Sequence, residues 1–174
     1  MKLIRSHEQC SIVATAMLLG IEPKEVIANV GHDGTEVKFP ELPAPLCYRG
    51  VHIQEIIDFA LIRGYALVPI EAMPAATTDN VNRYDVFGEH VAEYRLECAL
   101  KKYDGLLCGQ RACGVGHTVA WNRQEYRAYD PCGPTMWSLD CLTTIDFKIS
   151  TFWAAIKTPE RVISAISNHL QKII

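Results

Sequence analysis

Residues 11–19 have the sequence SIVATAMLL, an uncharged stretch that decides how the first part of the chain folds. Alanine, leucine and methionine are good helix formers, and a glycine such as Gly20 commonly follows the last turn of a helix. The stretch is apolar on nearly every side, which predicts a helix buried in the core. Cys10 directly precedes it, so we expect Cys10 in the first turn of this helix.

Outward from this helix, the first half of the chain predicts further helices separated by glycines and prolines. Pro23 fits the first position of a short helix, and an apolar stripe at helical spacing ends before Gly64. Residues 31–50 contain several glycines and prolines and predict a long loop, a kind of segment that often carries function. The other predicted elements of this half are helices at 23–30, 51–63 and 89–102 and a strand at 65–70.

After Gly105 the apolar pattern changes from helical spacing to the alternation that is typical of strands. Short strands are predicted at 106–108, 115–121, 125–129 and 147–157, and a closing helix at 159–171. Helices first and antiparallel strands second is the α+β pattern. We therefore expect one α+β domain over residues 1–174, with N-terminal helices packed on a C-terminal antiparallel β-sheet. The chain shows no internal repeat, and its length suits a single core.

Composition and charge exclude several classes of partner. Hydrophobic residues make up 49% of the chain and charged residues 21%, which is the usage of an ordinary globular protein. The net charge is −3 and no run of lysine or arginine occurs, so neither nucleic acid nor an anionic membrane surface is an expected partner. No apolar run approaches the roughly 20 residues that a membrane span needs.

The seven cysteines are spread along a chain that is too large to depend on disulfides. No apolar core of a secretory signal occurs near the start, because His7, Glu8 and Gln9 follow Arg5. The expected compartment is therefore the reducing cytoplasm. A protein that is exported by a route without a signal peptide would show the same sequence features.

Three residues, Cys10, His117 and Asp130, have the types and the order that thiol chemistry needs. A helix N-terminus favours the thiolate of Cys10, which is the reactive form of cysteine. His117 lies in a predicted strand and would accept the thiol proton. Asp130 ends the returning strand, where its carboxylate would orient the imidazole, and Asn122 is an alternative orienting group. We expect this chemistry to use no cofactor and no metal ion.

These motifs resemble those of the papain-like double-glycine leader peptidases, which process bacteriocin precursors. That family places its catalytic cysteine before an apolar helix, and continues with a Gly-His strand and a strand that ends in Asp-Pro. The corresponding segments here are 10–20, then 116–121 with the sequence GHTVAW, and 130–133 with the sequence DPCG. The resemblance covers most of residues 8–157. It implies a papain-like fold and a cysteine peptidase whose catalytic residues are Cys10, His117 and Asp130.

The oxyanion-hole position differs from the pattern of the family. The family usually carries a glutamine six residues before the cysteine, where this chain has Ile4. Gln9, directly before Cys10, is the expected substitute, and the backbone N–H groups of Cys10 and Ser11 are further donors. One such donor is typically worth about 2.7–4 kcal/mol of transition-state stabilisation.

The residues favour one principal function and leave two alternatives. The principal expectation is hydrolysis of an amide in a peptide or protein substrate through a thioester. The same machinery also serves amidases, acyltransferases and bacterial effectors. The first alternative is a catalytically inactive papain-like binding module. The second is a zinc-stabilised domain with Cys108, Cys113, His117 and Cys132 as ligands, although no Cys-x-x-Cys knuckle occurs.

Overall fold

The computed structural model describes residues 1–4, 9–35, 37–38, 47–48, 50–72, 88–111, 114–133, 136–138 and 147–159. The helices are α1 (Cys10–Leu19), α2 (Pro23–Val30), α3 (Ile53–Ile62) and α4 (Gly88–Lys102). The strands are β1 (Val37–Lys38), β2 (Cys47–Tyr48), β3 (Tyr65–Glu71), β4 (Gly105–Arg111), β5 (Gly116–Asn122), β6 (Arg127–Tyr129), β7 (Met136–Ser138) and β8 (Phe147–Lys157). None of the helices in the described part of the chain is both long enough and apolar enough to cross a membrane.

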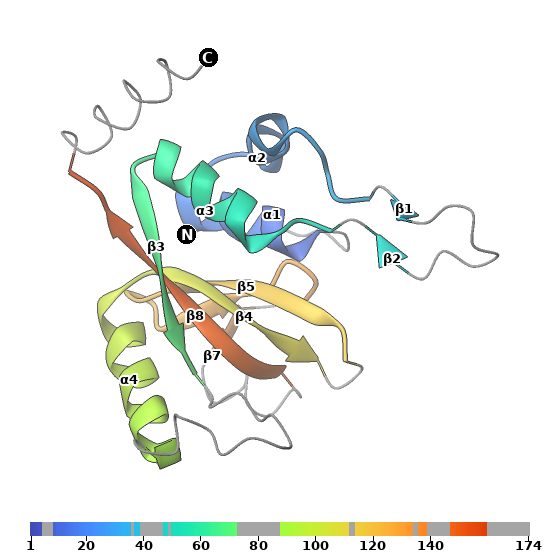
Figure 1. Cartoon of the computed structure of the whole chain (residues 1–174). Coiled ribbons are helices and arrows are strands. Elements are labelled where there is room, and N and C mark those ends of the chain that lie inside the picture. The colour runs from blue at the N-terminus through green and yellow to red at the C-terminus, as the bar shows by residue number, and fades with distance from the viewer. Residues whose placement is uncertain are drawn as a thin grey trace.

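Six strands form one antiparallel sheet in the order β3-β8-β4-β5-β6-β7, and β1 and β2 form a separate pair. Strand β8, the last along the chain, lies between β3 and β4 (Figure 1). Strands β4 and β5 are antiparallel neighbours, and Gly109 of β4 lies opposite His117 of β5. The pairing of β4 with β8 shifts register between Cys108 and Gly109, so a bulge lies next to the histidine position.

Helices cover both faces of the sheet, because alternate residues of its central strands point in opposite directions. Leu106 of β4 and Ala120 of β5 belong to a core cluster with residues of α1, α2 and α3. Their neighbours Leu107 and Val119 belong to a second cluster with residues of α4. Figure 1 shows the same arrangement, with α1–α3 on one side of the sheet and α4 on the other. The predicted α+β class is therefore confirmed, with α4 on the face opposite the first three helices.

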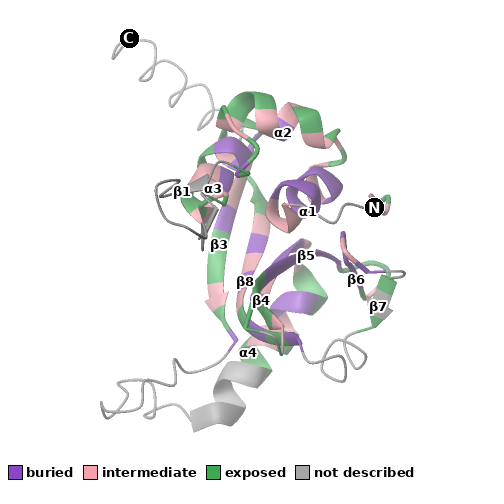
Figure 2. Cartoon of the chain, turned by 90° about the vertical axis from the view of Figure 1, so that its right-hand side faces the viewer, coloured by how far each residue is buried: buried purple, intermediate pink, exposed green. Residues whose placement is uncertain are grey.

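The uncharged stretch after Cys10 forms the predicted buried helix, α1. All residues from Ile12 to Met17 are buried, and Figure 2 shows α1 largely buried, whereas most of α2 is intermediate or exposed. Gly20 ends the helix with a φ of 68°, a left-handed conformation that glycine adopts without a steric penalty. Because α1 is packed on most of its surface, it has little freedom to shift, and the position of its first residue, Cys10, is fixed.

The predicted boundaries differ from the observed ones in a few places. Strand β4 is longer than predicted and extends to Arg111, and β6 begins only at Arg127, because a turn in which Tyr126 has a φ of 53° precedes it. The predicted loop 31–50 contains the pair β1 and β2, whose two-residue strands are too short to show an alternating pattern. The predicted closing helix 159–171 lies, apart from its first residue, outside the described residues.

Candidate active site

Cys10 is the first residue of α1 and lies beside the beginning of β5. The Ser11 hydroxyl is 3.4 Å from the Thr118 hydroxyl, and this contact ties the first turn of α1 to the strand that carries His117. Gln9 precedes the helix with φ 58° and ψ 55°, a left-handed conformation that is uncommon for a residue other than glycine. The chain therefore turns sharply into the helix immediately before Cys10.

His117 and Asp130 form a buried, hydrogen-bonded pair. The distance from His117 Nε2 to Asp130 Oδ1 is 2.8 Å, and the two side chains are only 6% and 5% exposed. A hydrogen on Nε2 donates to the carboxylate, so Nδ1 is the ring nitrogen that remains for another partner. The Cys10 thiol interacts electrostatically with the same ring, so the imidazole has the carboxylate as one partner and the thiol as the other.

Burial and pairing have opposite effects on the pKa values of this thiol and this imidazole. Burial by itself would raise the pKa of the Cys10 thiol, but the hydrogen bond and charge of His117 bring that pKa below its ordinary value. Burial would likewise lower the pKa of His117, but hydrogen bonds with Asp130 and Cys10 raise it to about 9. Both shifts favour a thiolate–imidazolium pair at neutral pH.

Asp130 follows β6 and accepts hydrogen bonds on both carboxylate oxygens. Oδ1 accepts from His117 Nε2 and from the Cys132 backbone N–H, each at 2.8 Å, and Oδ2 accepts from Arg111 Nη2 at 3.2 Å. Burial would raise the pKa of this carboxyl group, but the bonds from His117 and Cys132 and the charges of His117 and Arg111 hold it below its ordinary value. The side chain is therefore ionised at neutral pH, as an orienting carboxylate must be.

Arg111 is a member of this cluster that the sequence did not predict. Its Nη2 atom lies 3.0 Å from His117 Nε2. Arginine has only N–H donors, and His117 Nε2 carries the hydrogen that it donates to Asp130. Two donors face each other, so this contact is not a hydrogen bond. It places a permanent positive charge beside the imidazole. No sequence signal points to Arg111, because its place beside His117 depends on the turn between β4 and β5, in which its N–H donates to the Val115 carbonyl.

Two further thiols, Cys108 and Cys132, lie near the triad. The Cys108 sulfur is 3.6 Å from the Thr118 hydroxyl, and burial raises the pKa of this thiol. Burial also raises the pKa of Cys132, as does the negative charge of Asp130. Of these two thiols and Cys10, only Cys10 therefore has an environment that favours the thiolate.

The described residues do not assemble the predicted zinc site. Of its four ligands, Cys113 lies outside the described residues. Within the described part of the chain, the one group whose metal-ligating atoms all lie within 4.8 Å of one another is His117, Asp130 and Cys132. The Arg111 guanidinium lies within 3.2 Å of two of these side chains, and its positive charge opposes binding of a divalent cation there. This donor set therefore fits an ion-paired triad better than a zinc site.

The three residues predicted to be catalytic lie together in one cluster. Asn122 does not take the place of Asp130, because its Oδ1 accepts two backbone N–H groups of the turn that follows β5. Gln9 lies next to the cluster in the chain, and its side chain makes no capping hydrogen bond to α1. Its role in an oxyanion hole stays a prediction.

The fold and the cluster together define a class of protein. It is an α+β protein with a thiol, an imidazole and a carboxylate gathered between a buried helix and the end of an antiparallel sheet. Comparison of the chain with models of known protein families finds no match, and neither does comparison with curated protein sequences. The evidence for a function is therefore the geometry of the cluster itself.

Proposed function

We propose that the protein is a papain-like cysteine hydrolase in which Cys10 is the nucleophile, His117 the acid–base group and Asp130 the orienting carboxylate. The observation that carries this proposal is the 2.8 Å bond between His117 Nε2 and Asp130 Oδ1, with the Cys10 thiol in electrostatic interaction with the same ring. A thiol, an imidazole and a carboxylate linked in this order are the groups that acyl transfer by a cysteine needs.

The proposed reaction has an acylation step and a hydrolysis step. The Cys10 thiolate attacks the substrate carbonyl and forms a carbon–sulfur bond, and the imidazolium gives its proton to the leaving amine as the carbon–nitrogen bond breaks. The neutral ring then takes a proton from a water molecule, whose oxygen attacks the thioester. This releases the acid product and restores the thiolate and the imidazolium, while Asp130 keeps the ring in one orientation.

The charge that develops on the carbonyl oxygen needs donors close to Cys10. The first N–H groups of a helix have no partner within the helix, and the N–H of Cys10 is one of these groups. The expected second donor is Gln9, whose left-handed backbone immediately precedes the nucleophile. Together these groups would replace the family's upstream glutamine, whose position Ile4 occupies.

A peptide or protein is the proposed substrate, because the motifs resemble those of a peptidase family. The order of elements supports the resemblance: Cys10 opens α1, His117 lies in β5, and Asp130 follows β6. A binding module without chemistry needs neither a lowered thiol pKa nor an ionised carboxylate, and both are found here. The electrostatics therefore favour the enzyme over the inactive alternative.

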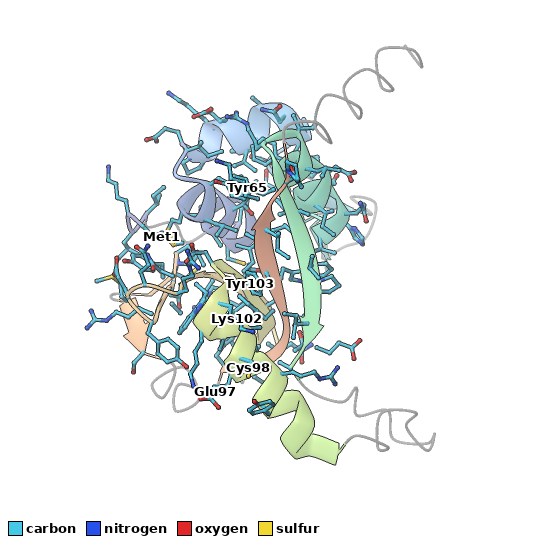
Figure 3. All side chains as sticks on the ribbon, turned by 90° about the vertical axis from the view of Figure 1, so that its left-hand side faces the viewer. Met1, Tyr65, Glu97, Cys98, Lys102 and Tyr103 are labelled. Carbon is cyan, nitrogen blue, oxygen red and sulfur yellow. The ribbon has the colours of Figure 1, made fainter. Side chains whose placement is uncertain are left out.

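The rate at which iodoacetamide alkylates each cysteine, followed by mass spectrometry near pH 6, tests the proposal. Cys98 is the internal reference, because it lies on α4, on the other side of the sheet from α1 (Figure 3). Cys10 should react at least about threefold faster than Cys98, because its lowered pKa leaves more of it as thiolate at this pH, although a thiolate of lower pKa is a weaker nucleophile. The variant His117→Ala should remove this advantage.

A second histidine variant controls for general effects of losing an imidazole. His52 caps α3, where its Nδ1 accepts the Gln54 N–H, and His52→Ala should leave the alkylation of Cys10 as it is in the wild type. Equal rates for Cys10 and Cys98 in the wild type, or an unchanged Cys10 rate in His117→Ala, would contradict the proposal.

A further inference from the structure

We propose that Arg111 is a positioning residue of this site, which holds Oδ2 of Asp130 and thereby keeps Oδ1 on His117. The inference rests on the proposed function and adds a fourth side chain to the three catalytic ones. Its basis is the distance of 3.2 Å from Arg111 Nη2 to Asp130 Oδ2, together with the 3.0 Å approach of the same atom to His117 Nε2.

Rotation of the Asp130 carboxylate would take Oδ1 away from His117. Rotation of the carboxylate about its Cβ–Cγ bond moves both oxygens, so each hydrogen bond at either oxygen opposes it, and the bond at Oδ2 adds to those at Oδ1. Among the described residues, the donors at Oδ1 of Asp130 are His117 and the Cys132 N–H, and the donor at Oδ2 is Arg111. The Arg111 bond is charge-assisted and is therefore stronger than a neutral one.

The backbone of Arg111 is itself fixed. Arg111 is the last residue of β4, its N–H donates to the Val115 carbonyl, and its carbonyl accepts the Gly114 N–H. In the sheet Arg111 lies opposite Phe147 of β8, whose ring packs edge-on against the His117 ring at 5.7 Å. Two residues that are paired in the sheet, Arg111 of β4 and Phe147 of β8, therefore both contact the His117 side chain.

The charge of Arg111 also acts on the groups around it. The described titratable side chains that act on Asp130 or His117, besides Arg111, are Cys10 on α1 and Cys132 after β6, and Cys108 on β4 interacts with Cys10. A positive charge in their midst favours the deprotonated form of each group, so its removal should move their titrations to higher pH. Loss of packing alone would instead slow Cys10 equally at every pH.

The test is the pH profile of Cys10 alkylation in two Arg111 variants and a matched control. Arg111→Met removes the charge and keeps most of the stem, and Arg111→Lys keeps the charge without the forked geometry. The control is Arg63→Met, because Arg63 is similarly exposed, 37% against 40%, and pairs with Glu25 instead. Thermal unfolding of each variant confirms that it is folded.

Arg111→Met should slow the alkylation of Cys10 at pH 6 roughly three- to tenfold, because one partly exposed, charge-assisted bond is lost. The acid limb of the profile should move to higher pH. Arg111→Lys should recover the position of that limb and part of the rate, and Arg63→Met should match the wild type.

Two results would overturn the inference while leaving the triad intact. One is a profile of Arg111→Met that superimposes on the wild type. The other is a uniform slowing at every pH that Arg111→Lys does not recover. A wild-type Cys10 that is no faster than Cys98 would instead contradict the proposed function, so the two failures are distinguishable.

Discussion

Burial and pairing act in opposite directions on Cys10, His117 and Asp130, and pairing prevails at each of them. Burial disfavours the charged form of all three groups, yet the Cys10 pKa is lowered, the His117 pKa is raised and the Asp130 pKa is lowered. Each charge is compensated by the next one in the chain of contacts. Removing one member therefore leaves a neighbouring buried charge without its partner, which is costly.

Gln9 carries the clearest local strain in the site. A left-handed backbone costs a residue other than glycine roughly 1–2 kcal/mol, so Gln9→Gly should raise the free energy of unfolding by up to about 1 kcal/mol in urea titrations. If the amide also serves the oxyanion hole, the same variant should acylate more slowly. Gln9→Ala is the control, because it loses the amide and keeps the strain. A less stable Gln9→Gly would contradict this description of the turn.

Among the elements, long patterns were predictable and short strands were not. The apolar run of α1 and the alternating pattern of β8 are long enough to predict a helix and a strand. Strand β8 is predicted at 147–157 and is observed at Phe147–Lys157. Strands β1, β2 and β7 have two or three residues each, and only their pairing partners define them. The bulge between Cys108 and Gly109 depends in the same way on β8, which is distant in the sequence.

At this bulge, Gly109 of β4 lies opposite His117 and leaves no room for a side chain. A Cβ atom on Gly109 would lie 2.1 Å from the Lys148 carbonyl oxygen, a backbone atom that cannot move aside without a shift of β8. Gly109→Ala should therefore lower the free energy of unfolding by about 1–3 kcal/mol in urea titrations. Gly116→Ala is the matched control, because a Cβ there meets no atom within 4 Å. Equal stability of the two variants would show that the bulge tolerates a side chain.

At the scale of the whole molecule, the site depends on a sheet with a separate core on each face. Cys10 opens the helix that packs in the first core, with Leu106, whereas Leu107 packs in the second core with residues of α4. The types and order of Cys10, His117 and Asp130 could be recognised in the sequence, because Cys10 directly precedes a predicted helix, His117 lies within a predicted strand and Asp130 directly follows another. Arg111 could not, because its place in the cluster depends on the register of β4 and β5.

The two cores allow a paired prediction, because Leu106 and Leu107 are adjacent and both fully buried. Leu106→Ala and Leu107→Ala should each lower the free energy of unfolding by about 2–5 kcal/mol. Only Leu106→Ala should also slow the alkylation of Cys10, because it loosens the face on which α1 packs. The free energies of unfolding come from urea titrations, and the alkylation of Cys10 is measured on folded protein well below the urea midpoint of each variant. Equal slowing in the two variants would show that the site does not depend on one face.

The most direct test of the proposed chemistry is to follow an acyl group on Cys10 itself. The protein is mixed with p-nitrophenyl acetate, nitrophenol release is recorded, and the acetylated peptide is identified by mass spectrometry. A working triad should acetylate Cys10, hydrolyse the thioester and release more than one equivalent of nitrophenol per chain, and Cys10→Ser should release far less. Acetyl groups spread over several thiols, or an acetyl group that stays on Cys10 without hydrolysis, would contradict the assignment of this protein as a cysteine hydrolase.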